Sequence, residues 1–375
     1  MSFLVGIAGL VSFFFGIRNK DNNLVAIGER SISAIFILLS LSVLTLIYLL
    51  VSKDYTNAYV AKNVSNDLSL VYSIASLWAG QEGSLLLWAW ILSLYNFTVR
   101  SSKSSKTLIV SSEGICQFIL VFFIFLIVFI ENPFESLDAP PLNGRGLNPI
   151  LQNFYMAIHP LTLYVGYIAL TIPFAFGLGS ILSKDKTDDW VLYSRRWTYF
   201  SWIFLSLGLL LGSRWAYLEL GWGGYWAWDP VENVALMPWL ALTAFVHSSM
   251  AQETRSLLRK WNISLIFIAF FLSIFGTFIT RSGLISSVHS FAQSSIGSYF
   301  IIFILFIVVF SIFMYQKNKK FIISVEEIIS LVSKENFLIF NNIFFLVITL
   351  TVFLGTVFPI ISEALTGEKV LVGPT

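Results

Sequence analysis

The chain has 375 residues, of which 57% are hydrophobic and only 12% are charged, about half the charged fraction of a soluble globular domain. This composition excludes a soluble protein, and a formal net charge of +2 without a long basic tract argues against a nucleic-acid partner. A single cysteine, Cys116, excludes a disulfide framework or a thiolate metal cluster within the chain.

The apolar residues fall into separate blocks of about 16 to 25, the length with which a helix crosses a hydrocarbon layer of roughly 30 Å. A membrane β-barrel would show alternating segments of about ten residues, whereas 35–50 and 118–130 are apolar on every face. The sequence therefore predicts an all-α polytopic integral membrane protein. Its expected spans, in chain order, are about 2–16, 32–51, 84–99, 115–130, 153–182, 198–213, 235–251, 261–280, 298–315 and 341–361.

The first and fifth of these spans have unusual lengths. The first is short, but positive residues follow it instead of preceding it, the reverse of a cleavable signal peptide, so we expect it to remain as a helix. The fifth, 153–182, is long enough to be broken at Pro173 or to begin in the membrane interface, which leaves the count at about ten. Because no heptad pattern, solenoid period or low-complexity linker divides the chain, we expect one membrane domain over residues 1–375.

The positive charges give the orientation. Of the 23 lysines and arginines, 17 lie in five alternate loops, and the remaining loops and the C-terminal tail hold six. The five loops are 17–31, 100–114, 183–197, 252–260 and 316–340. Because positive residues are retained on the cytoplasmic side, these loops are predicted to be cytoplasmic and both termini to lie outside.

The segment 214–240 is predicted to form an external tryptophan-rich loop and the start of the following helix. The tryptophans that fall within fourteen residues of one another are Trp215, Trp222, Trp226 and Trp228. An aromatic belt would explain some of them, but a belt spreads its aromatics over many helix ends. Flat rings beside flexible glycines suit a flat aromatic macrocycle such as haem, and nearby Arg214 with Arg281 suits its propionates.

The three histidines occupy different places in this topology. His159 lies about two turns into the fifth span from its outer end, and His289 lies in the outer loop 281–297. Alone, His289 would be an ordinary polar loop residue; beside the tryptophans, both become candidate axial ligands of haem iron. His247 lies inside the seventh span, where an ionisable residue is functional by default. It is either a ligand of a membrane b-type haem or a neutral imidazole hydrogen-bonded to a neighbouring helix.

Four ordered motifs resemble the CcmF family of cytochrome c haem lyase subunits, within the superfamily of haem-handling membrane proteins that carry a WWD loop. They are LWAGQEGSLLLW at 77–88, NP at 148–149 leading to HP at 159–160, the stretch 222–239, and GTFITRSG at 276–283 running to SSVHSFA at 286–292. Tyr225 stands where many members have tryptophan, and Leu161 where a second proline is common. Full-size members continue well past residue 374.

The resemblance implies an activity. Haem delivered on the outer face by a haem chaperone would be held over the tryptophan-rich loop and attached by thioether bonds to the Cys-x-x-Cys-His motif of apocytochrome c. His159 and His289 would be the axial ligands of that haem, and His247 one ligand of a second, intramembrane haem b that reduces it. The residues expected to bind haem are His159, His247, His289, Trp222, Trp226, Trp228, Asp229, Arg214 and Arg281; no catalytic residue is assigned.

The same resemblance implies partners. Besides apocytochrome c, the haem chaperone and membrane lipid, we expect thioredoxin-like or apocytochrome-binding maturation subunits, with activity only in their complex. The chain has no fourth histidine, so either a separate chain supplies the second ligand of the buried haem or that haem is lost and His247 is a packed residue. The expected location is the bacterial inner membrane, with the mitochondrial inner membrane as the alternative.

Two other functions stay open on the residues alone. A membrane haem export or relay protein without ligation activity would keep the outer ligands and add a polar path, yet the spans contain few ionisable residues besides His247. A secondary transporter would show an internal repeat with paired broken helices, and neither is found.

Overall fold

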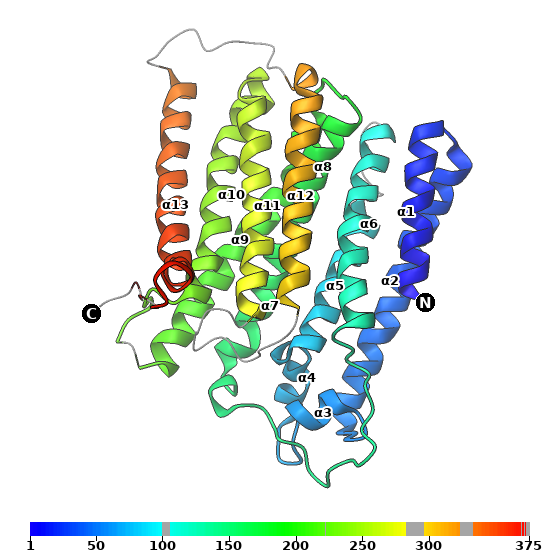
Figure 1. The fold of residues 1–375 in the computed structure, drawn as a ribbon, viewed down its shortest axis with the longest axis vertical. Coiled ribbons are helices and arrows are strands. Elements are labelled where there is room, and N and C mark those ends of the chain that lie inside the picture. The colour runs from blue at the N-terminus through cyan, green and yellow to red at the C-terminus, as the bar shows by residue number, and fades with distance from the viewer. Residues whose placement is uncertain are drawn as a thin grey trace.

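In a computed structural model, the chain folds into a bundle of long helices (Figure 1). The structure describes residues 1–99, 106–221, 223–282, 296–322, 333–368, 370 and 372. Within these ranges the long elements are all helical, and the only β pairing is an isolated bridge between Asn57 and Ser136. The predicted all-α membrane architecture is confirmed, since eight helical segments of the described chain are long and apolar enough to cross a membrane.

The helices follow the expected spans in order. Their bounds are α1 Ser2–Asn19, α2 Asn22–Ser52, α3 Ala58–Asn63, α4 Leu70–Ala79, α5 Gln81–Val99, α6 Lys106–Phe129, α7 Phe154–Ala169, α8 Thr171–Leu182, α9 Asp189–Glu219, α10 Pro230–Arg255, α11 Arg259–Ser282, α12 Gly297–Lys317 and α13 Lys334–Thr366. Each of the ten expected spans falls in one of these helices or in the α7–α8 pair. α5 and α9, which are not among the eight, are 19 and 31 residues long.

Two prolines shape the middle of the bundle. α7 ends at Ala169. Pro173, four residues later, has no N–H to donate to the carbonyl of Ala169, and the proline ring crowds that carbonyl. The expected break in the fifth span is therefore found just before this proline. In α10, Pro238 frees the carbonyl of Val234 in the same way, and the hydroxyl of Tyr167 from α7 donates to it at 3.0 Å. This hydrogen bond joins α7 to α10 where α10 could not satisfy its own backbone.

The bundle has two sides and a cap (Figure 1). α1, α2, α5 and α6 form one side, and α7 to α13 form the other. α3, α4 and the connection from α6 to α7 cap one end of the molecule. Large side chains such as Leu44, Ile302 and Phe344 are exposed on the outer helices. Lipid would cover these side chains, since only lipid tails solvate such a surface without cost.

Both ends of the described chain lie at the same end of the bundle. α1 begins and α13 ends toward the end of the bundle that carries the cap, and the connections that follow α1, α8 and α10 lie at the opposite end (Figure 1). This agrees with the expected even number of crossings. The positive-inside bias places the capped end outside.

One boundary expected from the sequence is wrong. The loop predicted at 100–114 ends by Lys106, where α6 begins, so Glu113 lies inside the bundle and is fully buried. Its neighbours are polar: Asn96 of α5 and Gln117 of α6 are also fully buried, and Gln117 donates to Ser31 of α2 at 3.1 Å. In the sequence, the polar residues of 106–114 are typical of a loop. In the structure they lie in a helix, because polar residues of other helices are buried beside them.

Candidate haem site

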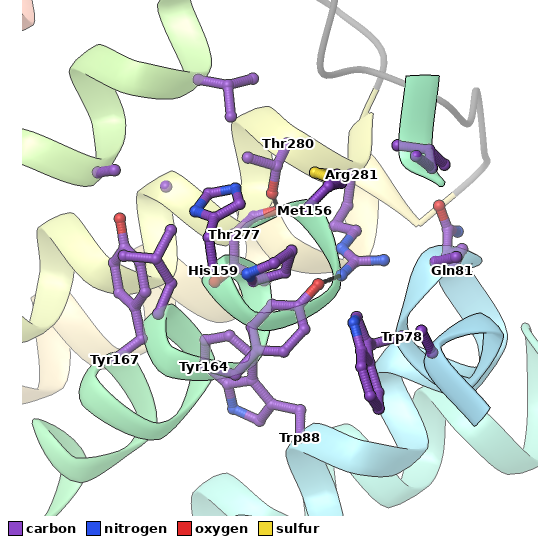
Figure 2. A pocket seen from close by; sticks show the side chains of 18 of the residues that line it. Trp78, Gln81, Trp88, Met156, His159, Tyr164, Tyr167, Thr277, Thr280 and Arg281 are labelled. Carbon is purple, nitrogen blue, oxygen red and sulfur yellow. Dashed lines mark hydrogen bonds between the residues drawn. The ribbon is translucent and has the colours of Figure 1, made fainter. Parts of the chain in front are cut away.

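A cavity of about 160 Å³ opens between α4, α5, α7, α10 and α11 at the capped end (Figure 2). Its walls are largely apolar, and four aromatic side chains, Trp78, Trp88, Tyr164 and Tyr167, contribute to them. Two of the predicted site residues, His159 and Arg281, line the same cavity although 122 positions separate them in the chain. An imidazole and a guanidinium thus meet in one aromatic pocket.

His159 reaches the cavity from the second turn of α7. The side chain of Asn153 caps that helix by accepting from the N–H of Tyr155 at 2.8 Å. The Nδ1 atom of His159 lies 3.3 Å from the carbonyl of Gly208 on α9, and its ring is nearly parallel to Trp215, 6.3 Å away. If Nδ1 donates to that carbonyl, Nε2 carries the lone pair of the ring, as in most histidines that bind iron.

Glycines on α9 allow this close approach. A Cβ atom at position 212 would lie 2.8 Å from Nδ1 of His159, and one at position 208 would lie 2.6 Å from a methyl group of Leu163. Both distances are too short for a side chain. The two glycines therefore let α7 and α9 pack so that the imidazole lies flat against α9.

Arg281 enters from the last turn of α11. Its Nη2 atom donates to the hydroxyl of Tyr164 at 2.6 Å, and the guanidinium lies 5.9 Å from the centre of that ring (Figure 2). Arg214, the other predicted propionate partner, is exposed at the end of α9, 5.6 Å from the ring of Tyr217. A hydrogen bond with Tyr155 raises the pKa of Arg214 above its ordinary value. Of the two arginines, only Arg281 lines the cavity.

The tryptophan-rich loop is placed apart from the cavity walls. Trp222 lies outside the described residues, and Trp226 is about one-third exposed. Trp228 has a left-handed backbone with φ of 59°, and its ring packs on α13, where a Cβ at position 355 would lie 2.8 Å from it. Its Nε1 atom is buried without a hydrogen-bond partner among the described residues. The loop is thus anchored to α13, and this indole N–H still requires an acceptor.

Asp229 has a local structural role. Its carboxylate accepts from the N–H of Val231 at 2.9 Å and caps α10, while Pro230 occupies the first helical position. Glu232 accepts from the N–H of Ala227 at 3.2 Å, which closes the turn that precedes the helix. The WWD-type segment therefore holds the loop to the start of α10.

His247 does not join the cavity. It lies toward the other end of α10 and faces α13, where its Nδ1 atom is 2.7 Å from Nδ2 of Asn341. The ring of Phe345 is 5.8 Å away. This is the geometry expected of an imidazole hydrogen-bonded to a neighbouring helix. His289 lies outside the described residues.

The motif LWAGQEGSLLLW supplies wall residues to which the sequence assigned no role. Gln81 is 2% exposed and lines the cavity; its Nε2 donates to Glu131 at 2.9 Å, while its Oε1 is buried without a partner in the described chain. Burial raises the pKa of Glu131, and the nearby Glu82 raises it further. The turn at Gly80 is held by the hydroxyl of Tyr59, which accepts from its N–H at 3.1 Å. The only signal for these roles was the motif itself.

Comparisons with known proteins agree with this picture. A family model described as cytochrome C assembly protein matches residues 78–289. The cytochrome c-type biogenesis protein CcmF of Escherichia coli (strain K12) is 36% identical over 376 residues, which cover 98% of this chain and 58% of the relative. The corresponding protein CycK of Rhizobium meliloti (strain 1021) is 37% identical over 96% of this chain and 53% of its own length.

A solved structure named cytochrome c heme lyase CcmF has the same fold, with a TM-score of 0.82 at 28% identity over 97% of this chain and 56% of that one. The chain spans about half the length of the curated relatives it matches. The family model covers more than half of the residues and includes both His159 and Arg281. The chain belongs to the cytochrome c assembly protein family.

Proposed function

We propose that this chain is the haem-holding core of a cytochrome c haem lyase, active within a larger assembly of the bacterial inner membrane. It holds haem at the capped, outer end so that apocytochrome c receives it at the Cys-x-x-Cys-His motif. The observation that carries this proposal is the cavity that brings His159 and Arg281 into one aromatic pocket. Its partners in this proposal are a haem chaperone and apocytochrome-binding or thioredoxin-like proteins.

The cavity suits part of a haem. Its volume of about 160 Å³ is below the roughly 300–1,000 Å³ of pockets that enclose a small ligand, so an edge of the macrocycle would enter and the rest would remain open. In this proposal, Nε2 of His159 is one axial ligand and Arg281 pairs with a propionate. The open side then exposes the vinyl groups to the incoming peptide, with His289 as the second axial ligand.

The covalent step needs little from the protein besides position. Each cysteine S–H of the apocytochrome adds across a vinyl C=C bond, so a C–S bond forms at one carbon and the proton is transferred to the other. No atom of this chain enters the product. What the chain supplies is proximity and orientation, which are large contributions to catalysis when two reactants must meet.

The test is the amount of covalent haem on a reporter apocytochrome c. Replacing His159 with Ala should abolish maturation with the chain still present in the membrane, and external imidazole should restore part of it by occupying the vacated ligand position. The matched control is Asp138→Ala, at an exposed polar residue in the connection from α6 to α7, which should mature cytochrome at the wild-type level. A relay protein without ligation activity would bind haem yet leave the covalent yield independent of His159; wild-type maturation in His159→Ala would refute the proposal.

We further propose that His247 is one ligand of a buried haem b that reduces the outer haem, and that a separate chain provides the other ligand. His247 suits this role because its ring lies at the α10–α13 surface inside the membrane and only its Nδ1 atom is bound by a described residue. When bound, the group would supply an electron. Co-expression with the partner chain should produce a low-spin b-type spectrum that His247→Ala removes; normal maturation in that variant would favour a purely structural histidine.

A further inference from the structure

One polar contact inside the membrane joins α10 to α13. The side chain of Asn341 on α13 lies 2.7 Å from Nδ1 of His247, a residue 94 positions earlier in the chain. The opposite face of α10 is already fixed to α11: Asn262 donates to Gln252 at 2.8 Å and contacts Ser248. The backbone of His247 is therefore held from behind, and Asn341 holds the edge of its ring.

The chemistry of imidazole makes this contact decisive. A neutral ring has one N–H, and the nitrogen that binds iron must be the one without it. Histidines that bind metals usually donate the other N–H to a fixed acceptor. An asparagine amide can act in either sense, because a half-turn about its Cβ–Cγ bond exchanges the positions of Oδ1 and Nδ2.

We propose that Asn341 is the positioning residue of His247, and this inference rests on the buried haem proposed above. With Nδ2 toward the ring, as found here, Nδ1 accepts, the proton stays on Nε2 and iron has no lone pair to bind. With Oδ1 toward the ring, Nδ1 donates and Nε2 becomes the ligand. The amide thus couples the tautomer of His247 to haem binding.

A neighbouring asparagine provides a matched control. Asn342 is fully buried on the same helix, and its two side-chain polar atoms have no partner in the described part of the chain. Asn342→Leu removes an amide of the same size at the same depth without touching His247. Asn341→Leu removes the contact, and Asn341→Asp leaves a group that, when ionised, can only accept.

The first measurement uses the chain co-expressed with its maturation system and purified in detergent. Asn341→Leu should retain the buried haem about 10- to 100-fold more weakly, the usual effect of losing such a partner. Asn341→Asp should retain haem with a more negative reduction potential, because a carboxylate makes the ligand more basic and favours ferric iron. Asn342→Leu should match wild type; an Asn341→Leu protein with wild-type affinity and potential would overturn the inference.

The second measurement does not need haem. The chain has three histidines, so ¹⁵N-histidine labelling gives three ring pairs, and a His247→Gln variant identifies the relevant one. In haem-free wild type, His247 should have its proton on Nε2 alone, and in Asn341→Leu it should exchange between tautomers. Identical His247 signals in the two proteins would refute the role of Asn341 even if haem is present. If wild type binds no His247-dependent haem, the buried haem is wrong while this comparison still decides the positioning role.

Discussion

The ring of His159 is fixed before any haem arrives. The carbonyl of Gly208 lies on one edge of the imidazole and the ring of Trp215 lies parallel to it. A ligand held in this way spends little conformational entropy on binding, the usual advantage of preorganisation. The sequence predicted the residue but not this support, because Gly208 and Trp215 are on a different helix.

The two arginines predicted to bind the haem propionates differ in position, because only Arg281 lines the cavity. Arg281→Gln should weaken haem retention strongly. Tyr164→Phe should weaken it about tenfold, because it removes the hydrogen bond to the Arg281 guanidinium, and a hydrogen bond to a charged group is worth roughly 1.5 kcal/mol. Arg281→Lys should recover only part of the loss, since an ammonium lacks the planar fork. Retention is measured as haem bound per chain after gel filtration.

Arg214→Gln is the matched control for this series. Arg214 is exposed and rests on Tyr217 outside the cavity, so its loss should change haem retention far less than the loss of Arg281. If Arg214→Gln proves the more damaging substitution, the haem propionates lie at the end of α9 and the assignment to the cavity is wrong.

At the level of helices, the start of α10 links the tryptophan-rich loop to the bundle. Asp229 caps the helix, and Trp228 packs on α13 in a left-handed conformation. A non-glycine residue with positive φ is strained, and this conformation persists only where the surrounding contacts hold it. The Asp229 cap and the Trp228 ring are therefore two of the contacts that hold the loop, and loss of either should loosen the haem platform.

Asp229 offers a test of that view. Asp229→Ala should lower the free energy of unfolding by about 1 kcal/mol and reduce haem retention, whereas Asp229→Asn and Asp229→Ser should keep most of both, because either side chain can cap a helix. Thermal unfolding in detergent and haem content would be measured on the same samples. If Asn and Ser behave like Ala, the carboxylate itself contacts the ligand and capping is not its main role.

The ten spans could be predicted because a lipid solvent demands continuous apolar helices, and the break before Pro173 because proline lacks a donor. The burial of Glu113 could not, since the buried polar residue that donates to its backbone carbonyl, Asn96, belongs to α5. The pairing of Gln81 with Glu131 across 50 residues was equally hidden. Local pattern determines the helices, whereas the site depends on contacts between helices that no local pattern contains.

The molecule as a whole has its site at the capped end and its positive loops at the other. Single cysteines introduced at the exposed positions Tyr225 and Lys186, with Cys116 replaced by Ala, should report this orientation. An impermeant thiol reagent added to intact cells should label the Tyr225→Cys protein, and it should label Lys186→Cys only after the membrane is opened.

The reverse labelling pattern would place the cavity in the cytoplasm. Cytochrome c matured there would contradict the route proposed above, because the cavity with His159 and Arg281 is at the same end of the bundle as the connection from α9 to α10, which carries Tyr225. The Cys116→Ala chain without an introduced cysteine, treated with the same reagent, serves as the unlabelled control in both conditions.

The central claim is that this chain holds haem iron through His159. The most direct measurement is the low-temperature electron paramagnetic resonance and absorption spectrum of the haem-loaded chain in a His247→Ala background, where the outer haem alone remains. We expect a low-spin, six-coordinate iron that becomes high-spin, or is lost, when His159→Ala is added. A low-spin spectrum that is unchanged by His159→Ala would contradict it.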